Sequence, residues 1–222
     1  MLNKCLFGCL LILHASSARC EVSHEEGFMQ LFDGKSLDGW IGDGKQFFDV
    51  ADGVMACQQG CHGKLVTQQE YRDFVLRFEF KLTVGANNGL AIRAPLEGDA
   101  AYAGIELQIL DNTADKYQNL KDYQFHGSAY GIAAAKRGAL KPVGKWNTQE
   151  VVCQGRTIKV TLNDIIILDI DLDKAAPDDK TIDGEDHPGL KRHQGHVGFL
   201  CHNDRVYFRN VRVKEMQSLV AE

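Results

Sequence analysis

Apolar and polar residues alternate along most of this chain with a period of two. Between positions 74 and 82 every second residue is apolar, from Phe74 to Leu82, and mostly charged residues fill the positions between them. A helix would spread both sets around its axis, whereas a strand sorts them onto two faces. The same alternation predicts strands over 90–93, 104–111, 146–154, 157–162, 165–171, 195–202 and 205–214.

Short turns rich in glycine, asparagine and aspartate separate these runs. They fall at 51–53, 85–89, 154–156 and 202–204, and such turns are typical of antiparallel hairpins. Helical periodicity is weak throughout, and the sequence shows neither repeats nor a linker. The pattern therefore predicts an all-β fold, an antiparallel β-sandwich or jelly roll, as a single domain over residues 21–222.

Two long polar connections interrupt the strand pattern. The first, over 111–145, is rich in aromatic residues, and we expect it to be ordered and to help form a site. The second, over 173–194, is strongly charged, and we expect it to be a solvated excursion. Its aspartates and those near Asp111 could hold calcium, but their spacing matches no regular calcium loop, so no cofactor is predicted.

The N-terminus has the features of an export signal. Lys4 precedes an apolar run from Leu6 to Leu13, which is too short to span a bilayer, and small residues follow at 15–18. Residues 1–20 are therefore predicted to be a signal peptide, with cleavage after Ala18 or Cys20 and export to the periplasm or exterior. A buried N-terminal strand is the alternative. Arg19 argues against a lipid anchor at Cys20.

Charge and length exclude several other classes of function. The 222 residues carry a net charge of −5, which becomes −7 once Lys4 and Arg19 are removed with the signal. No basic stripe remains, which argues against a nucleic-acid partner. No further segment could cross a membrane. The oligomeric state is not encoded in any pattern that we recognise.

Cysteine usage agrees with export. Four of the 7 cysteines lie in the body of the chain, an even number in an oxidising compartment. Cys57 and Cys61 flank a short turn and are predicted to form a disulfide. Cys153 and Cys201 either pair across strands or remain buried thiols. Zinc is disfavoured, because His62 beside Cys61 lacks a second pair of ligands.

Polar side chains on the central strands suggest a binding surface. If these strands are neighbours in one sheet, their polar faces form a groove lined by acids and bases, which suits sugar hydroxyls. The residues concerned are Arg77, Glu79, Lys81, Arg93, Glu106 and Gln108. The alternative is a solvated sheet face with cross-strand ion pairs.

Five segments resemble the 3-keto-disaccharide hydrolase family. They are 27–40 (GFMQLFDGKSLDGW), 87–93 (NNGLAIR), 104–112 (GIELQILDN), 141–147 (KPVGKWN) and the stretch from Gly198 through His202 to 208–211 (FRNV). The order of the segments is that of the family, and together they bracket nearly the whole mature chain. The sequence departs from the family pattern at Asn88, where Ser is common, and at Cys201-His202-Asn203.

The resemblance implies a concanavalin A-like lectin/glucanase fold and action on glucosides already oxidised at carbon 3. A ketone there acidifies the hydrogen on carbon 2, so elimination becomes the easier path to cleavage. The resemblance implies site positions at Arg93, Glu106, Gln108, Asp111, Lys141 and His202. In this hypothesis Glu106 is the base or acid, Arg93 or Lys141 steadies the enolate, and His202 or Asp111 moves the second proton.

Three other functions fit the same sequence. An ordinary glycosidase could use Glu79 with Glu106, or Glu106 with Asp111, as its two carboxylates. A lectin-like module could bind a carbohydrate without cleaving it, since such sandwiches host both functions. A structural role in a surface assembly is the third.

Overall fold

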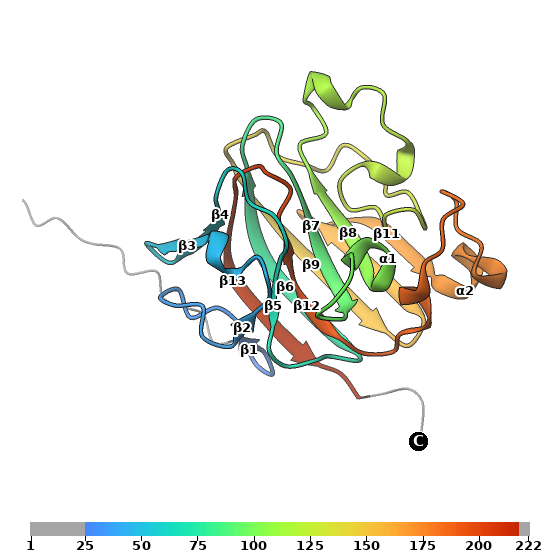
Figure 1. Ribbon diagram of the computed structural model, residues 1–222, viewed down its shortest axis with the longest axis horizontal. Helices are drawn as coiled ribbons and strands as arrows, with labels where there is room; N and C mark the ends of the chain where they lie inside the picture. The colour runs from blue at the N-terminus through green and yellow to red at the C-terminus, as the bar shows by residue number, and fades with distance from the viewer. Residues whose placement is uncertain (1–24, 218–222) are drawn as a thin grey trace, which may run out of the picture.

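The structure, a computed structural model, describes residues 25–217 and consists of two antiparallel sheets packed face to face (Figure 1). The first sheet has the order β11 (Ile165–Asp171), β10 (Thr157–Leu162), β9 (Trp146–Gln154), β6 (Phe74–Leu82), β13 (Val206–Glu215), β4 (Val54–Cys57) and β3 (Phe48–Ala51), and β1 (Met29–Gln30) also pairs with β13. The second sheet has the order β2 (Trp40–Ile41), β5 (Lys64–Thr67), β12 (His196–Leu200), β7 (Asn87–Ala94) and β8 (Ile105–Leu110).

Helices are short and lie outside the sheets. Two are single α-helical turns, α1 (Ala100–Ala103) and α2 (Leu172–Ala175). The 3-10 turns are η1 (Lys45–Phe47), η2 (Asp115–Tyr117), η3 (Asp122–Gln124), η4 (Pro177–Asp179) and η5 (Pro188–Lys191). None of the described helices is long and apolar enough to cross a membrane. The predicted signal peptide lies outside the described residues.

The core lies between the sheets and is built from the apolar faces that the sequence pattern marks. In β6 every second residue from Phe74 to Leu82 is buried, so the apolar residues of the alternating pattern point inward. At the centre the rings of Phe199 and Phe208 stack with centroids 3.8 Å apart, and Phe78 packs edge-on to Phe199 at 5.4 Å. The predicted all-β sandwich is confirmed.

The assignment of strands to sheets differs from the expectation. β6 lies in the first sheet between β9 and β13, whereas β7 and β8 form an edge of the second sheet. The polar faces of β6 and β8 therefore lie on opposite sides of the molecule. The expected single groove across all three strands is wrong.

The predicted disulfide is also wrong. Among the described residues the structure contains no disulfide: Cys57, Cys61, Cys153 and Cys201 are all buried free thiols. Cys153 lies in the core on β9, away from the others in sequence and in sheet position.

The two long connections are both ordered. The first returns to the edge of the second sheet, where Tyr130 N donates to Glu106 O at 2.9 Å and Gln108 N donates to Ser128 O at 3.0 Å. The second does not behave as a solvated excursion, because His187 and Leu190 are buried within it and η5 packs against α1. This expectation is corrected, and both connections help to frame the second sheet.

The buried His126 makes stability depend on pH. Its ring stacks on Phe80, its Nε2 lies 3.0 Å from Gln149 Oε1, and its Nδ1 accepts from Leu110 N at 3.4 Å. Burial lowers the pKa of His126 from its ordinary 6.5 to about 4. Because the unfolded chain then binds a proton more readily, the folded state loses stability as pH falls through the window from 6.5 to 4.

We expect the free energy of unfolding to fall by about 2 kcal/mol between pH 7 and pH 5 through this group. Urea unfolding of the wild type and of His126→Gln at both pH values measures it. The variant lacks the titrating ring, so its stability should change less over the same interval. An identical pH dependence in both proteins would contradict the assignment.

Candidate functional site

The outer face of the second sheet is hollowed beside α1. A cavity of about 270 Å³ opens there, and it is lined by Asn87, Asp99, Ala101, Tyr102, Glu106, Gln108, Tyr130 and His202. A second cavity of about 210 Å³ adjoins it, shares Asp99 and His202, and adds Asp43 and Lys64. Together the two cavities have the scale of a small-molecule site.

The floor of the first cavity follows from the register of β7 and β8. Glu106 pairs with Ala91 and Gln108 pairs with Gly89, so both long side chains stand beside small residues on the same face. A Cβ on Gly89 would overlap the Glu106 carboxylate. The missing side chain of Gly89 is therefore what lets the carboxylate lie flat over the sheet.

One wall of the cavity is α1, whose Ala100 packs on Ala91, Ala94 and Leu200 of the second sheet. Asp99 caps the helix, since its carboxylate accepts from Ala101 N at 3.0 Å. The turn carries Tyr102 to the cavity wall. Tyr130 also lines the cavity, on the segment that pairs with β8.

Glu106 and His202 form an acid–base pair at the bottom of the cavity. The Glu106 Oε1 lies 3.7 Å from His202 Nε2, and the Glu106 side chain is only 5% exposed. Oε1 is buried and has no hydrogen-bond partner among the described residues. Burial raises the pKa of Glu106, and the nearby Glu106 in turn raises the pKa of His202. A carboxylate that lies near an imidazole and has no hydrogen-bond partner is suited to proton transfer.

The adjoining cavity holds a buried cation. Lys64 is 5% exposed, and its Nζ donates to Gly98 O at 2.6 Å. Burial lowers the pKa of Lys64. Two of its three ammonium protons remain for a ligand. The adjoining cavity therefore places a positive charge near the Glu106–His202 pair.

A buried His–Asp pair supports the Tyr102 wall. His187 Nε2 lies 3.0 Å from Asp183 Oδ2, and the His187 ring packs on Tyr102 with centroids 4.9 Å apart. Burial, aided by the negative charge of Asp183, raises the pKa of Tyr102. The hydroxyl of Tyr102 therefore stays protonated and can donate a hydrogen bond.

The structure brings together three of the residues singled out in the sequence: Glu106, Gln108 and His202. Arg93 is not among them. A bulge between β7 and β12 and a φ of 50° at Arg93 turn its side chain into the interior. There its guanidinium donates to Gly155 O at 2.8 Å and lies 3.5 Å from Asp73. Its expected place in the site is corrected to a structural one.

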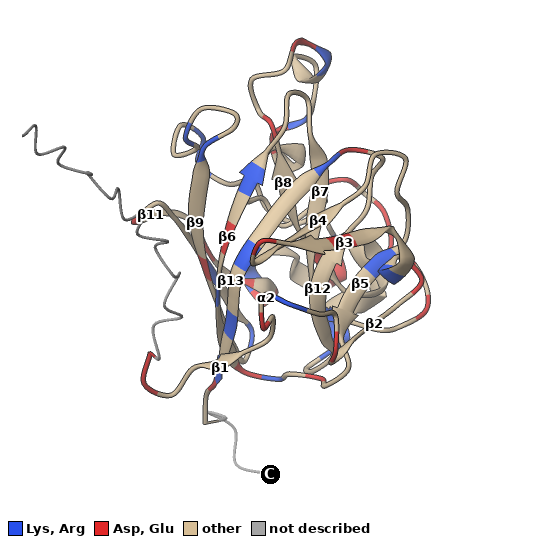
Figure 2. Ribbon diagram, turned by 90° about the vertical axis from the view of Figure 1, so that its left-hand side faces the viewer, with Lys and Arg blue, Asp and Glu red and all other residues tan. Residues whose placement is uncertain are grey.

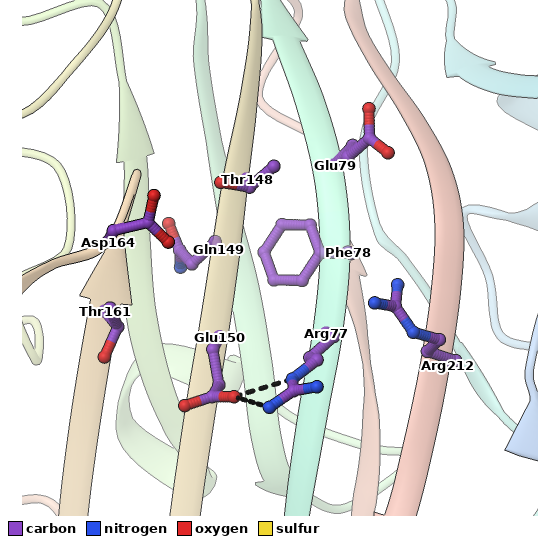
Figure 3. A pocket seen from close by; sticks show the side chains of 9 residues that line it. All are labelled: Arg77, Phe78, Glu79, Thr148, Gln149, Glu150, Thr161, Asp164 and Arg212. Atoms are coloured by element: carbon purple, nitrogen blue, oxygen red, sulfur yellow. Dashed lines mark hydrogen bonds and ion pairs between the residues drawn. The ribbon is translucent and has the colours of Figure 1, made fainter. Parts of the chain in front are cut away.

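The three charged residues of β6 lie on the other sheet. Figure 3 shows Arg77 and Glu79 on the outer face of the first sheet, where Arg77 contacts Glu150 at 2.6 Å. Glu79 is held by Arg209 at 2.7 Å, and Lys81 lies over the Trp146 ring. Basic residues run along β6 and β13 on this side of the molecule (Figure 2). Arg77 and Glu79 therefore form cross-strand ion pairs, Lys81 packs on aromatic rings, and none of the three can face Glu106.

Asp111 and Lys141 also lie apart from the cavity. The Asp111 carboxylate accepts from Gly85 N at 2.8 Å and from Thr113 Oγ1 at 2.6 Å, so it fixes a turn. Burial acts to raise the pKa of Asp111, but these hydrogen bonds outweigh it and hold the pKa below its usual value. Lys141 is exposed on the loop before β9. Neither side chain lines either cavity.

Comparison with known proteins identifies the family. Residues 27–214 match the family of the 3-keto-alpha-glucoside-1,2-lyase-like domain. The chain belongs to this family. It is therefore an enzyme of a carbohydrate-acting, glycoside-cleaving family. A 3-keto-disaccharide hydrolase of Bacteroides thetaiotaomicron is 27% identical, and the match covers 85% of this chain and 78% of that protein.

Solved structures support the same fold. A crystal structure of a candidate glycosyl hydrolase from Parabacteroides distasonis is 28% identical, with a TM-score of 0.74, and the match covers 85% of this chain and 99% of that one. A Bacillus subtilis protein with a galectin-like fold matches with a TM-score of 0.51 at 11% identity, over 79% of this chain and 89% of that one. The lectin-type sandwich of the family is thus confirmed.

Sequence reasoning missed several residues of the site: Lys64, Asn87, Asp99, Tyr102 and Tyr130. Tyr130 lies in the connection whose aromatic content marked it as site-forming, so that signal was present. Asp99 precedes a run of alanines, which is a readable cap position for a helix. Lys64 gives no signal, because a single lysine at the start of a short strand is ordinary.

Proposed function

We propose that this enzyme cleaves glucosides that carry a ketone at carbon 3, with Glu106 as the base. The observation that supports it is the buried Glu106 carboxylate, whose Oε1 has no partner and lies 3.7 Å from His202 Nε2 at the bottom of a sugar-sized cavity. The relative from Bacteroides thetaiotaomicron, a 3-keto-disaccharide hydrolase, points to the same substrates.

The reaction begins with proton abstraction. Glu106 takes the hydrogen on carbon 2 as a proton, and the electrons of that bond form an enolate with the ketone at carbon 3. Burial raises the pKa of Glu106, so the carboxylate is a stronger base than an exposed one. Lys64 supplies the positive charge that favours an enolate in the adjoining cavity.

The glycosidic bond then breaks. The enolate electrons form a double bond between carbons 1 and 2, the bond from carbon 1 to oxygen breaks, and His202 donates a proton to the departing oxygen. Water then adds across the double bond, with its proton on carbon 2 and its hydroxyl on carbon 1. Tyr102 and Tyr130 supply hydroxyl groups and ring surfaces to hold the sugar.

Isotope incorporation tests this function. The purified enzyme is incubated in D₂O with a 3-keto-glucoside and with the same glucoside unoxidised. We expect cleavage of the oxidised substrate alone, and one deuterium on carbon 2 of the product. The free 3-keto sugar in D₂O without enzyme measures background exchange.

The other outcomes are distinct. Cleavage of the unoxidised glucoside without label would overturn the proposal and favour a two-carboxylate glycosidase, in which Asp99 would replace Glu79 as the partner of Glu106, because Asp99 lines the same cavity. Binding without cleavage of either sugar would identify a lectin-like module.

A further inference from the structure

Three cysteine thiols meet at one end of the sandwich. Cys201 also lines the adjoining cavity that holds Lys64, whereas Cys57 and Cys61 line neither cavity. Cys57, Cys61 and Cys201 are buried, and their sulfur atoms all lie within 4.8 Å of one another. They come from the end of β4, from the loop after it, and from the residue that follows β12. The cluster thus joins the first sheet to the second.

Backbone hydrogen bonds fix the positions of the three thiols. Cys201 N donates to Gly63 O at 2.9 Å, and Asn203 N donates to Cys61 O at 2.9 Å. Gly60 N donates to Asn203 O at 2.8 Å, which closes the link between the two segments. These hydrogen bonds join the two loops and hold the three sulfur atoms close together. A ligand would therefore bind to a preorganised site.

Cys57 both donates and accepts hydrogen bonds, and its thiol donates to Asp204 O at 3.3 Å. Val206 N donates to its sulfur at 3.3 Å, and the Asn88 side-chain amide donates at 3.5 Å. Hydrogen bonds of this kind stabilise sulfur ligands in metal sites. Asn88 is one of the positions at which this sequence departs from the family pattern.

We propose that Cys57, Cys61 and Cys201 bind one thiophilic metal ion, zinc(II) or copper(I). Metal–sulfur bonds of about 2.3 Å place two thiolates on one ion roughly 4 Å apart, which agrees with the observed spread. Soft thiolate ligands select these ions over calcium or magnesium. Binding releases one proton from each thiol that becomes a ligand.

The number of ligands bears on which ion binds. Among the described residues no His, Asp or Glu joins the three sulfur atoms. Zinc would therefore complete its tetrahedron with a small ligand such as water, whereas copper(I) can bind the three sulfurs alone. Three thiols also exceed what one disulfide consumes, so pairing would leave one of them unused.

Metal content of the purified protein tests the proposal. The full chain is isolated under anaerobic, reducing conditions, stripped with a chelator, and mixed separately with zinc(II) and with copper(I). We expect one equivalent of metal per chain after gel filtration, sulfur-to-metal charge-transfer absorption with copper(I), and a higher Tm. Cys201→Ser should weaken binding at least tenfold. The matched control is Cys153→Ser, because Cys153 is equally buried but lies outside the cluster.

Two results would overturn the proposal. One is equal metal retention by the wild type and by Cys201→Ser. The other is a mass for the unreduced protein that is lower by the two hydrogens of a disulfide. If Cys201→Ser does not fold, protection of the wild-type thiols from alkylation by bound metal gives the same answer without a variant. None of these readouts depends on sugar cleavage.

Discussion

Replacing Glu106 by Gln is expected to lower kcat on a 3-keto-glucoside by about a thousandfold, the middle of the range for loss of a general base. The change keeps the shape of the side chain and its place over Gly89 but removes the atom that accepts the proton. KM should change little, because the amide can still hydrogen-bond a hydroxyl. Initial rates at saturating substrate measure the effect.

Two controls separate the loss of the catalytic base from a loss of folding and from a general effect of removing a carboxylate. Burial raises the pKa of Glu106, so a neutral side chain there should leave the Tm unchanged or raise it. Glu79→Gln makes the same chemical change on the other sheet, where Glu79 pairs with Arg209. It should retain full activity. Wild-type rates in Glu106→Gln would remove Glu106 from the mechanism.

Replacing Phe199 by Ala is expected to lower the free energy of unfolding by about 4 kcal/mol. Phe199 is fully buried, and it contacts Phe208 and Phe78 from the first sheet and Trp40 from its own. The truncation therefore leaves a cavity where the two sheets meet. Because β12 carries the segment that ends in Cys201 and His202, this core position also supports the site.

Urea unfolding followed by tryptophan fluorescence and by far-UV circular dichroism measures this loss. Phe199→Leu keeps most of the volume and should lose less than half as much. Val84→Ala is the surface control, since Val84 is 84% exposed and should change stability by less than about 0.5 kcal/mol. Equal stability of the Phe199→Ala and Val84→Ala proteins would show that the sheets do not pack as described.

The longer strands could be predicted from the sequence because apolar and polar residues alternate within each of them. Alternation in β6 and β8 separates an apolar face from a polar face. In β6 the observed burial follows it, whereas in β8 both faces are buried. Alternation does not report which strands pair. β6 and β8 have the same pattern, yet they belong to different sheets and turn their polar faces in opposite directions. The first five strands, β1 to β5, have two to four residues each and are too short for a period to show.

The site was predictable only where side-chain direction follows the regular period. Glu106 and Gln108 obey it and reach the cavity. Arg93 breaks it, because a bulge and a positive φ turn it inward, and no residue type in that segment announces the bulge. The thiol cluster was missed for a related reason: Cys201 meets Cys57 and Cys61 only through the packing of two sheets.

The alanine-lined seat of α1 sets the width of the proposed active site. The small side chains of Ala91, Ala94 and Ala100 allow α1 to pack close to the sheet backbone. Asp99 caps α1 and Tyr102 belongs to it, so both move with this helix. A bulkier residue at any of these three positions would push α1 away from the sheet and so change the width of the cavity. Substitutions at Ala91 and Ala94, which line neither cavity, are thus expected to change the substrate range of this enzyme.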